Sequence, residues 1–446
     1  MQRLLYRTFK RLYRVSRWFR RRFTPMGLLV LGILIASGII GIDTRYTMAY
    51  QIAGLATALV AVSFLSGLLV RVRFEVERFM PDFCSDGETF EYGVRIRNLT
   101  PRRQAGLFVR ERPDSGLPTF QAFLNSHEPG EEKRNRFDRF VGYPRWEWLV
   151  SQTQGAAVGD EALPVLPPRG EIAVTLSLTP RRRGNIQLEG LTLIRPDPLG
   201  LVKTCINVKL PETLLALPKR VPVPDLDLPG SRHHQPGGIT QASSVGDAEE
   251  FFSLRDYRPG DSLRRVHWRS WARTGKAVVK EFQEEYFVRY GLLLDTFARP
   301  RQNQIFEDAV VLAASCVTRT DSPDILLDLM FVGTRAYCFT SGRGLLPTAR
   351  MLEILACVNP TWKQEFDSVQ QMLAGRTTRM SGCICVLLAW DEPRRKLVRW
   401  LRANDVAVEV LLVTEGKQAV DPGPMWDRPH CFHLVESGNL EGALSG

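Results

Sequence analysis

The run "YGLLLDTFARPRQNQIFEDAVVLAASCVTRTDSPDILLDLMFV", residues 290–332, decides the fold class of the C-terminal part of the chain. Residues 290–297 and 324–332 are short apolar runs, which predict buried strands. Between them, residues 303–320 repeat apolar side chains at intervals of three and four, which predicts an amphipathic helix. A strand, a helix and a strand joined by short loops predict a parallel β-α-β unit.

The alternation of strand and helix patterns continues to the end of the chain. It predicts a doubly wound α/β domain over residues 288–446, with a mostly parallel sheet. The further elements expected are a helix, a strand, a helix and a strand, at residues 345–358, 383–390, 392–405 and 406–413.

Two aspartates stand where such a sheet binds ligands, beyond the carboxyl ends of its strands. Asp295 and Asp391 each follow a predicted strand, and carboxylates are ligands of hard cations such as Mg²⁺ or Mn²⁺. The position resembles the D-x-S-x-S metal motif of the von Willebrand factor type A domain. This sequence has "DTFAR" (295–299), with Phe297 and Arg299 in place of the serine ligands. We expect a degenerate site without metal, in which the aspartates cap loops.

The eight cysteines predict core thiols in a reducing compartment rather than metal ligands. They include no C-x-x-C pair, and Cys383 and Cys385 share one face of a predicted strand. A short C-terminal strand accounts for the cluster of His430, Cys431 and His433 without a metal.

Residues 71–218 carry strand patterns instead of helix patterns. Residues 87–100, 170–180 and 184–200 alternate polar and apolar side chains or concentrate β-branched ones, and each run ends at Asn, Pro or Gly. They predict an all-β sandwich of immunoglobulin size, with irregular residues at 110–165.

Residues 219–248 are rich in proline and glycine, which disfavours regular backbone hydrogen bonding. We expect an extended linker between the β domain and the rest of the chain.

The basic charge is concentrated in an N-terminal arm. The net charge is +11, and residues 1–22 hold nine Arg and Lys and no acid, which leaves +2 for the remaining residues. This distribution disfavours a nucleic-acid partner for the folded domains. Two uncharged stretches follow the arm and predict a transmembrane helical hairpin within residues 23–70, with spans at about 25–43 and 48–70.

Arginines flank the predicted hairpin on both sides, at residues 20–22 and at Arg71 and Arg73. By the positive-inside rule both termini and all residues from 71 onward are cytoplasmic. A cleaved signal peptide is the rival interpretation, but it lacks an A-x-A site and a second span follows. The arm itself is either a basic amphipathic helix on the anionic inner leaflet or only a topology signal.

The segment at residues 249–287 contains "RPGDSLRRVHWRSWARTG" (258–275), with five arginines, one histidine and two tryptophans. It allows three interpretations: a nucleic-acid patch, a catalytic cluster with His267 as base, or a structural corner that also serves as a partner surface. No nucleic-acid module surrounds it, and the sequence places no activated Ser, Cys or phosphate loop beside His267. The structural corner is therefore favoured, because Trp and Arg are common interface anchors.

Local patterns in this segment predict a turn followed by a helix. Pro259, Gly260 and Asp261 suit a turn in which the aspartate caps the helix, and Gly275 suits its end. We expect Trp268 and Trp271 to face a core, and a strand to follow at residues 277–282.

The run "FFSLRDYRPGDSLRRVHWRSWARTGKAVVKEF", residues 251–282, resembles the signature of the domain of unknown function 58 (DUF58) family. Residues 181–201 also resemble the R-R-G and D-P-[FL]-G-L stretches of that family. The matching signature positions are Arg255, Tyr257, Arg258, Pro259, Gly260, Asp261, Arg265, His267, Trp268, Ala272, Arg273 and Lys276.

The resemblance implies a function without catalysis or cofactor, since the family has no established reaction. Its members are typically encoded beside MoxR-type AAA+ ATPases and transglutaminase-like membrane proteins. By that analogy we expect an adaptor of the bacterial inner membrane that docks such an ATPase or its client in cell-envelope maintenance, with the signature residues as the partner surface. The alternative is a metal-dependent ligand-binding or enzymatic module that uses Asp295 and Asp391.

Overall fold

The computed structural model divides into two compact units, Met1–Lys219 and Arg220–Gly446. The described residues are 2–40, 47–68, 72–114, 116–126, 128, 131, 134–223, 251–259, 261, 263, 266–282, 288–298, 303–320, 325–342, 346–361, 366–416 and 420–440.

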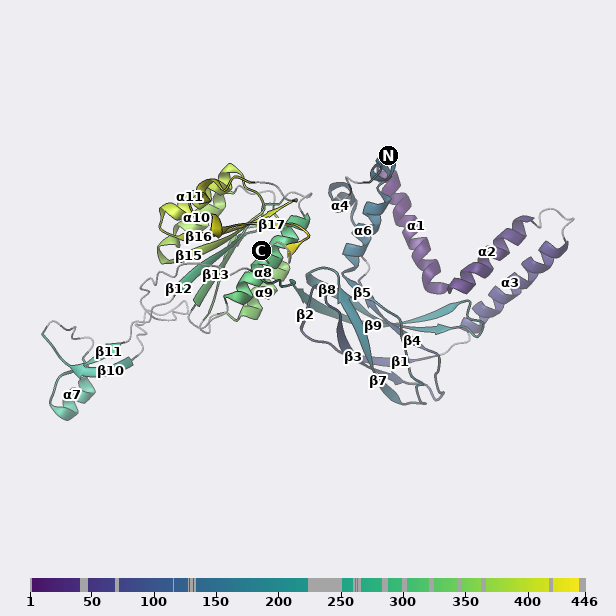
Figure 1. Ribbon diagram of the computed structural model, residues 1–446. Helices are drawn as coiled ribbons and strands as arrows, with labels where there is room; N and C mark the ends of the chain where they lie inside the picture. Colours follow the sequence, from purple (N-terminus) through teal and green to yellow (C-terminus); the bar gives the residue numbers. More distant parts are fainter. Residues whose placement is uncertain are drawn as a thin grey trace. The chain divides into compact units, whose positions relative to one another are not determined.

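Three helices open the first unit: α1 (Gln2–Arg22), α2 (Pro25–Ile40) and α3 (Thr47–Leu68). The apolar helices α2 and α3 lie side by side (Figure 1). Residues 48–67 in α3 are long and apolar enough to cross a membrane, whereas α2 is apolar but shorter. Two apolar helices are therefore present at the predicted positions, and their connection at residues 41–46 lies outside the described residues.

Helix α1 is amphipathic, as one of the two interpretations of the arm expects, but part of its apolar face packs against protein. Tyr6, Phe9 and Tyr13 surround Trp146, with ring centroids 5.6, 6.3 and 6.4 Å away. The Tyr13 hydroxyl also accepts a hydrogen bond of 2.7 Å from Gln154 Nε2. That part of the face is consequently not available to a lipid surface.

The middle of the chain is β-rich, as predicted. One sheet has the strand order β1-β3-β7-β5 and the other β2-β9-β8-β4-β6. Val94 and Leu178 of the first sheet and Leu193 and Leu214 of the second belong to a single buried cluster. The strands are β1 (Phe74–Phe79), β2 (Phe83–Ser85), β3 (Phe90–Asn98), β4 (Phe108–Pro113), β5 (Ala156–Val158), β6 (Glu161–Ala162), β7 (Glu171–Pro180), β8 (Gly184–Pro196) and β9 (Lys203–Leu217).

Three helices lie between β4 and β5, where the sequence predicted irregular chain: α4 (Phe120–Asn125), α5 (Arg136–Val141) and α6 (Tyr143–Gln154). The prediction was wrong for α6, which buries Trp146, Leu149 and Val150. Its apolar stripe is short, and the aromatic residues of α1 that cover it come from far away in the sequence.

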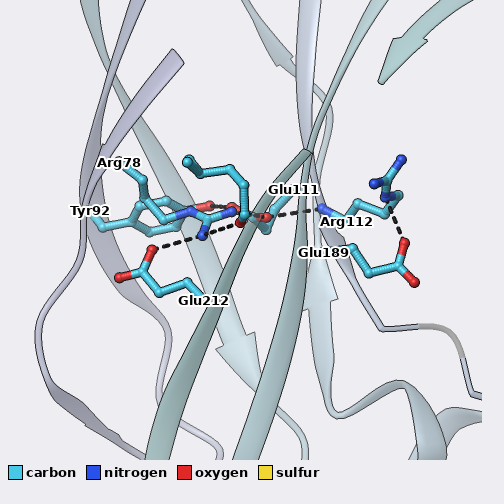
Figure 2. A network of polar contacts seen from close by, with 7 residues as sticks. Arg78, Tyr92, Glu111, Arg112, Glu189 and Glu212 are labelled. Atoms are coloured by element: carbon cyan, nitrogen blue, oxygen red, sulfur yellow. Dashed lines mark hydrogen bonds and ion pairs between the residues drawn. The ribbon is translucent and has the colours of Figure 1, made fainter. Parts of the chain in front are cut away.

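A buried ionic network crosses the β-rich core (Figure 2). Arg78 on β1 and Glu111 on β4 pair at 2.7 Å, and both side chains are 1% exposed. The Tyr92 hydroxyl donates to Glu111 at 2.6 Å, and Glu212 is the second partner of Arg78, at 2.8 Å. Burial raises the pKa of Glu111 despite the opposing effects of Arg78 and Tyr92. The network links strands of both sheets through the buried Arg78–Glu111 pair, while Glu212 at its edge is 40% exposed.

The loop between β8 and β9 holds the elbow between α1 and α2. Asp197 accepts hydrogen bonds from the amides of Leu201 and Val202, each 2.7 Å long, and this fixes the loop. The Thr24 hydroxyl then donates to Gly200 O at 2.6 Å. A Cβ on Gly27 would collide with the Leu201 carbonyl oxygen, so glycine is required at that approach.

The second unit contains an α/β domain, as predicted. Its sheet order is β14-β13-β12-β15-β16-β17, parallel except for the edge strand β14. Helices α8 and α9 cover one face of the sheet, and α10 and α11 cover the other (Figure 1). The elements are β12 (Val288–Leu294), α8 (Asn303–Arg319), β13 (Ile325–Val332), β14 (Ala336–Ser341), α9 (Thr348–Cys357), α10 (Asp367–Ala374), η4 (Thr377–Arg379), β15 (Gly382–Leu387), α11 (Glu392–Ala403), β16 (Ala407–Thr414), η5 (Gly423–Met425), η6 (Pro429–Cys431) and β17 (Phe432–Glu436).

The expected linker begins as ordered chain. Val221 and Val223 are buried, Val221 N donates to Ser315 Oγ at 2.9 Å, and Arg319 donates to Val223 O at 2.7 Å. The first residues of the predicted linker therefore dock on α8. Residues 224–250 lie outside the described residues.

The buried network predicts a large loss of stability when its acid is removed. Replacing Glu111 by alanine leaves the Arg78 guanidinium without its buried partner, so we expect the free energy of unfolding to fall by about 3–5 kcal/mol. Glu77→Ala is the matched control, because Glu77 pairs with Arg95 at the surface and its loss costs at most about 1 kcal/mol. Chemical denaturation of the purified protein measures both variants; equal losses would contradict the role of burial.

Candidate functional site

The signature segment is built on two antiparallel strands, β10 (Phe251–Asp256) and β11 (Val278–Phe282), which lie on either side of α7 (Trp268–Thr274). Strand β11 was expected, whereas β10 was not. Val266 bridges to Val279, and both side chains are buried. Tyr257 N donates to Ala277 O and His267 N to Val278 O, each at 2.9 Å. These contacts tie the connection between the strands to β11.

Asp261 organises the turn, but it does not cap the helix. Both of its carboxylate oxygens pair with the Arg255 guanidinium at 2.7 Å, and one accepts from Arg258 N at 2.8 Å. The hydrogen bonds from Arg255 and then from Arg258 lower the pKa of Asp261 to about 2. Helix α7 begins at Trp268, well beyond the reach of Asp261. The predicted N-cap is wrong, and an ion pair across the turn takes its place; Gly275 does end the helix, with φ 70°.

Trp268 and Trp271 form a stacked pair on the surface of α7. Their ring centroids are 5.2 Å apart at an interplanar angle of 21°, and the two residues are 58% and 37% exposed. The expectation that they face a core is wrong within the described part of the unit, because the short helix turns them outward. Arg269, Arg273 and Lys276 are exposed in the same stretch of chain.

His267 has a hydroxyl beside it, which the sequence reasoning missed. Its Nδ1 lies 2.6 Å from Ser270 Oγ, three residues later on the first turn of α7. A nucleophile and base pair also needs a third group that orients the histidine, and no described carboxylate bonds to His267. We therefore interpret the contact as a local hydrogen bond at the start of α7. Among the other predicted residues, Pro259 is exposed, and Gly260 and Arg265 lie outside the described residues.

Asp295 and Asp391 come together at the switch point of the sheet, where β12 and β15 pair. Asp295 is 1% exposed and accepts from Phe297 N at 2.9 Å and from Leu388 N at 3.1 Å. Asp391 is the N-cap of α11 and accepts from Arg394 N at 3.3 Å. Both aspartates thus bind backbone amides at strand ends, as predicted.

Arg394 joins the two carboxylates. Its Nε lies 2.6 Å from Asp295 and its Nη1 2.7 Å from Asp391, while its guanidinium carbon lies 4.7 Å from the Phe366 ring centroid. Burial alone would lower the pKa of Arg394, but Asp295 and then Asp391 outweigh it and raise that pKa. The residue is 6% exposed, so its charge is confined between the two acids.

These residues do not fit a divalent cation. The oxygens that would bind a metal at Asp295 are already bonded to two amides and a guanidinium, and Phe297 supplies a ring in place of a hydroxyl. The guanidinium also brings positive charge to the place where a cation would sit. Arg394 was not predicted to take part in the site. The available signal was its position three residues after Asp391 at the start of a helix, since residues three apart on a helix can pair.

Comparison with known proteins finds the expected family likeness over part of the chain. Residues 253–414 match the model of a family described as "Protein of unknown function DUF58". The uncharacterized protein YeaD of Bacillus subtilis is 26% identical over 135 residues, which is 30% of this chain and 32% of that protein. The chain thus spans about a third of the length of this curated relative. The C-terminal region is an α/β domain with a mostly parallel sheet and an aspartate after its first strand, the arrangement that the resemblance to the von Willebrand factor type A domain predicts.

Two solved structures are similar to parts of the chain. The CARDB domain of PF1109 from Pyrococcus furiosus is 16% identical and covers 31% of this chain and 96% of its own, with a TM-score of 0.16. The manganese-loaded TRAP protein of Plasmodium vivax is 14% identical and covers 35% of this chain and 71% of its own, with a TM-score of 0.25. At these scores the likeness adds nothing to the strand order described above.

We expect the α/β domain to lose stability when the Arg394 guanidinium is removed. Arg394→Met leaves Asp295 buried without its counter-charge, so we expect a loss of about 3–5 kcal/mol in the free energy of unfolding. Arg399→Met on the same helix removes only a surface pair with Glu392 and should cost at most about 1 kcal/mol. Denaturation of both variants tests this, and a neutral Arg394→Met would show that the ion pair is dispensable.

Proposed function

We propose, from the premise that residues 253–414 belong to the DUF58 family, that this protein is a non-catalytic adaptor anchored in the bacterial inner membrane. Its cytoplasmic domains dock a MoxR-type AAA+ ATPase or the client of that ATPase, in maintenance of the cell envelope. A transglutaminase-like membrane protein is a further partner by the same analogy. The docking surface is the pair Trp268 and Trp271 with the cations around it.

The exposed tryptophan pair carries this proposal. An aromatic side chain in water buries a large area when a partner covers it, and Trp and Arg are the most frequent hot-spot residues of interfaces. Here two stacked rings stand on a helix beside Arg269 and Arg273. The bidentate pair of Arg255 with Asp261 stiffens the turn before that helix, so the surface loses little conformational freedom on binding.

The anchor is supported by the apolar surface of α2 and α3. Ile39, Leu55 and Leu65 are each more than half exposed, which is unfavourable in water and favourable in a bilayer. The arginines before α2 favour a cytoplasmic N-terminus by the positive-inside rule. We propose that the two helices form the transmembrane hairpin predicted above and that both termini are cytoplasmic.

We also propose an immunoglobulin-like arrangement for the β-rich domain. Two sheets that share one core, with β2 pairing in parallel with the last strand β9 at a sheet edge, support it. In the sequence this domain separates the membrane helices from the docking surface.

The metal-dependent alternative meets an obstacle in Arg394, whose guanidinium occupies the carboxylates that the metal would need. We expect calorimetric titration of the purified protein with MgCl₂ or MnCl₂ to show no stoichiometric binding. One bound ion per chain that is lost in Asp295→Asn would instead establish the alternative.

Affinity capture tests the docking surface. The tagged full-length protein in detergent, incubated with lysate and ATP, is expected to retain an AAA+ ATPase identified by mass spectrometry. Trp268→Ala with Trp271→Ala should lower its recovery at least about 10-fold, because truncating a hot spot costs about 2 kcal/mol or more.

Trp426→Ala is the matched control, since Trp426 is 76% exposed on another surface of the same unit. Equal recovery by all variants would place the ATPase contact elsewhere. Absence of an AAA+ ATPase from the wild-type sample would remove the adaptor proposal.

A further inference from the structure

A basic groove lies in the first unit between α1, α6 and the strands β4, β8 and β9. Its volume is about 920 Å³, within the range of about 300–1,000 Å³ usual for small-molecule sites. Among the described residues that line it, nine are Arg or Lys and two are Glu. One wall is helix α6, whose residues Trp146 and Val150 are buried in the same cluster as Phe9 of α1.

The cations in this groove repel each other. Partial desolvation in the groove, followed by repulsion from Arg17, Arg110 and Arg112, lowers the pKa of Arg21. Charges of one sign that are held together in this way are stabilised when an anion binds between them. Helix α1 also contacts β9 here, where the Cys205 thiol donates to Arg21 O at 3.5 Å.

The acids in and around the groove do not neutralise it. Glu111 is committed to Arg78 and Tyr92 inside the core. Arg110 pairs with Asp160 at the surface and Arg112 with Glu189, so two of the nine cations are matched by acids outside the lining. The excess positive charge is concentrated on the last two turns of α1, including Arg17 and Arg21.

The place of the groove in the chain indicates which anion would reach it. Arg20–Arg22 end α1 and also line the groove, and the apolar helix α2 begins at Pro25. In a protein anchored as proposed above, this is the depth of lipid head groups, where basic side chains attract anionic phospholipids. Leu12 and Trp18, which also line the groove, offer apolar contact to the adjoining glycerol and acyl carbons.

We propose that this groove binds the phosphate head group of an anionic phospholipid. The guanidinium groups of Arg17 and Arg21 hold the phosphate oxygens with charge-assisted hydrogen bonds, while Lys203 on β9 closes the site from the sheet side. The proposal rests on the membrane anchorage proposed above, which carbonate extraction of membranes tests separately.

Native mass spectrometry of the full-length protein in detergent tests the groove. The probes are short-chain phosphatidylglycerol and, as the neutral lipid, phosphatidylcholine of the same chain length. We expect one phosphatidylglycerol to bind per chain, and the Arg17→Gln/Arg21→Gln variant to bind it about 30-fold more weakly, which is about 2 kcal/mol at 1.4 kcal/mol per tenfold.

Two further variants separate the groove from general basicity and from misfolding. Arg7→Gln/Arg11→Gln removes the same charge from the same helix outside the groove lining and should keep the wild-type affinity. Arg17→Lys/Arg21→Lys keeps the charge and should restore most of the binding.

Three outcomes would overturn the proposal. Equal weakening by both glutamine pairs would mean that α1 attracts lipid only by its overall charge. Equal binding of phosphatidylcholine would remove the role of the anion. Displacement of the lipid by an equal concentration of inorganic phosphate would assign the groove to a soluble phosphate instead. None of these outcomes depends on capture of an ATPase.

Discussion

The buried ion pair between Arg394 and Asp295 is the constraint on which the α/β domain depends. It lies where the chain switches from one half of the sheet to the other, so it ties the end of β12 to the start of α11 beyond β15. Neither group can be desolvated alone without a cost of several kcal/mol. Because Arg394 sits on α11 and Asp391 caps that helix, the same contact also sets where the helix begins.

A guanidinium at this place changes what the edge of the sheet can do. A metal ion that binds a ligand keeps one coordination position open for it. Arg394 has no such free position, because its guanidinium pairs with Asp295 and Asp391 and lies against the Phe366 ring. The edge therefore serves the cohesion of the domain. In the function proposed above, partner recognition falls to the stacked tryptophans of α7, away from this edge.

The elements of the α/β domain were predictable because their signals are local. Strand β15 is buried at every position and appears in the sequence as one apolar run, and α8 carries a continuous apolar stripe. Helix α6 was missed because its buried side chains, Trp146 above all, are covered by α1, and no local pattern records a partner so distant in the sequence. The edge strand β14 was also missed, because its apolar run of four residues, Ala336 to Phe339, is too short to separate a strand from a loop or a helix turn.

The candidate sites were less predictable than the fold, because arginine residues have several different structural roles in this chain. Arg78 and Arg394 are buried counter-charges, Arg255 stiffens a turn, and Arg17 lines a groove. In the sequence all of them are basic residues among apolar ones. Only the burial of each side chain and the acid opposite it separate a structural role from a binding role. The exposure of Trp268 was not predicted for a related reason. A helix of seven residues has too few turns for its sequence pattern to indicate which face is buried.

The contact between Thr24 and the loop that ends at Leu201 also determines an order of events during synthesis. The two residues are 177 positions apart, and at about 5–20 residues per second the ribosome needs roughly 9–35 s to make the chain between them. Helix α2 therefore emerges long before the carbonyl groups that receive Thr24 exist. The elbow can close only after the loop has been made, so the β domain assembles next to helices that were synthesised well before it.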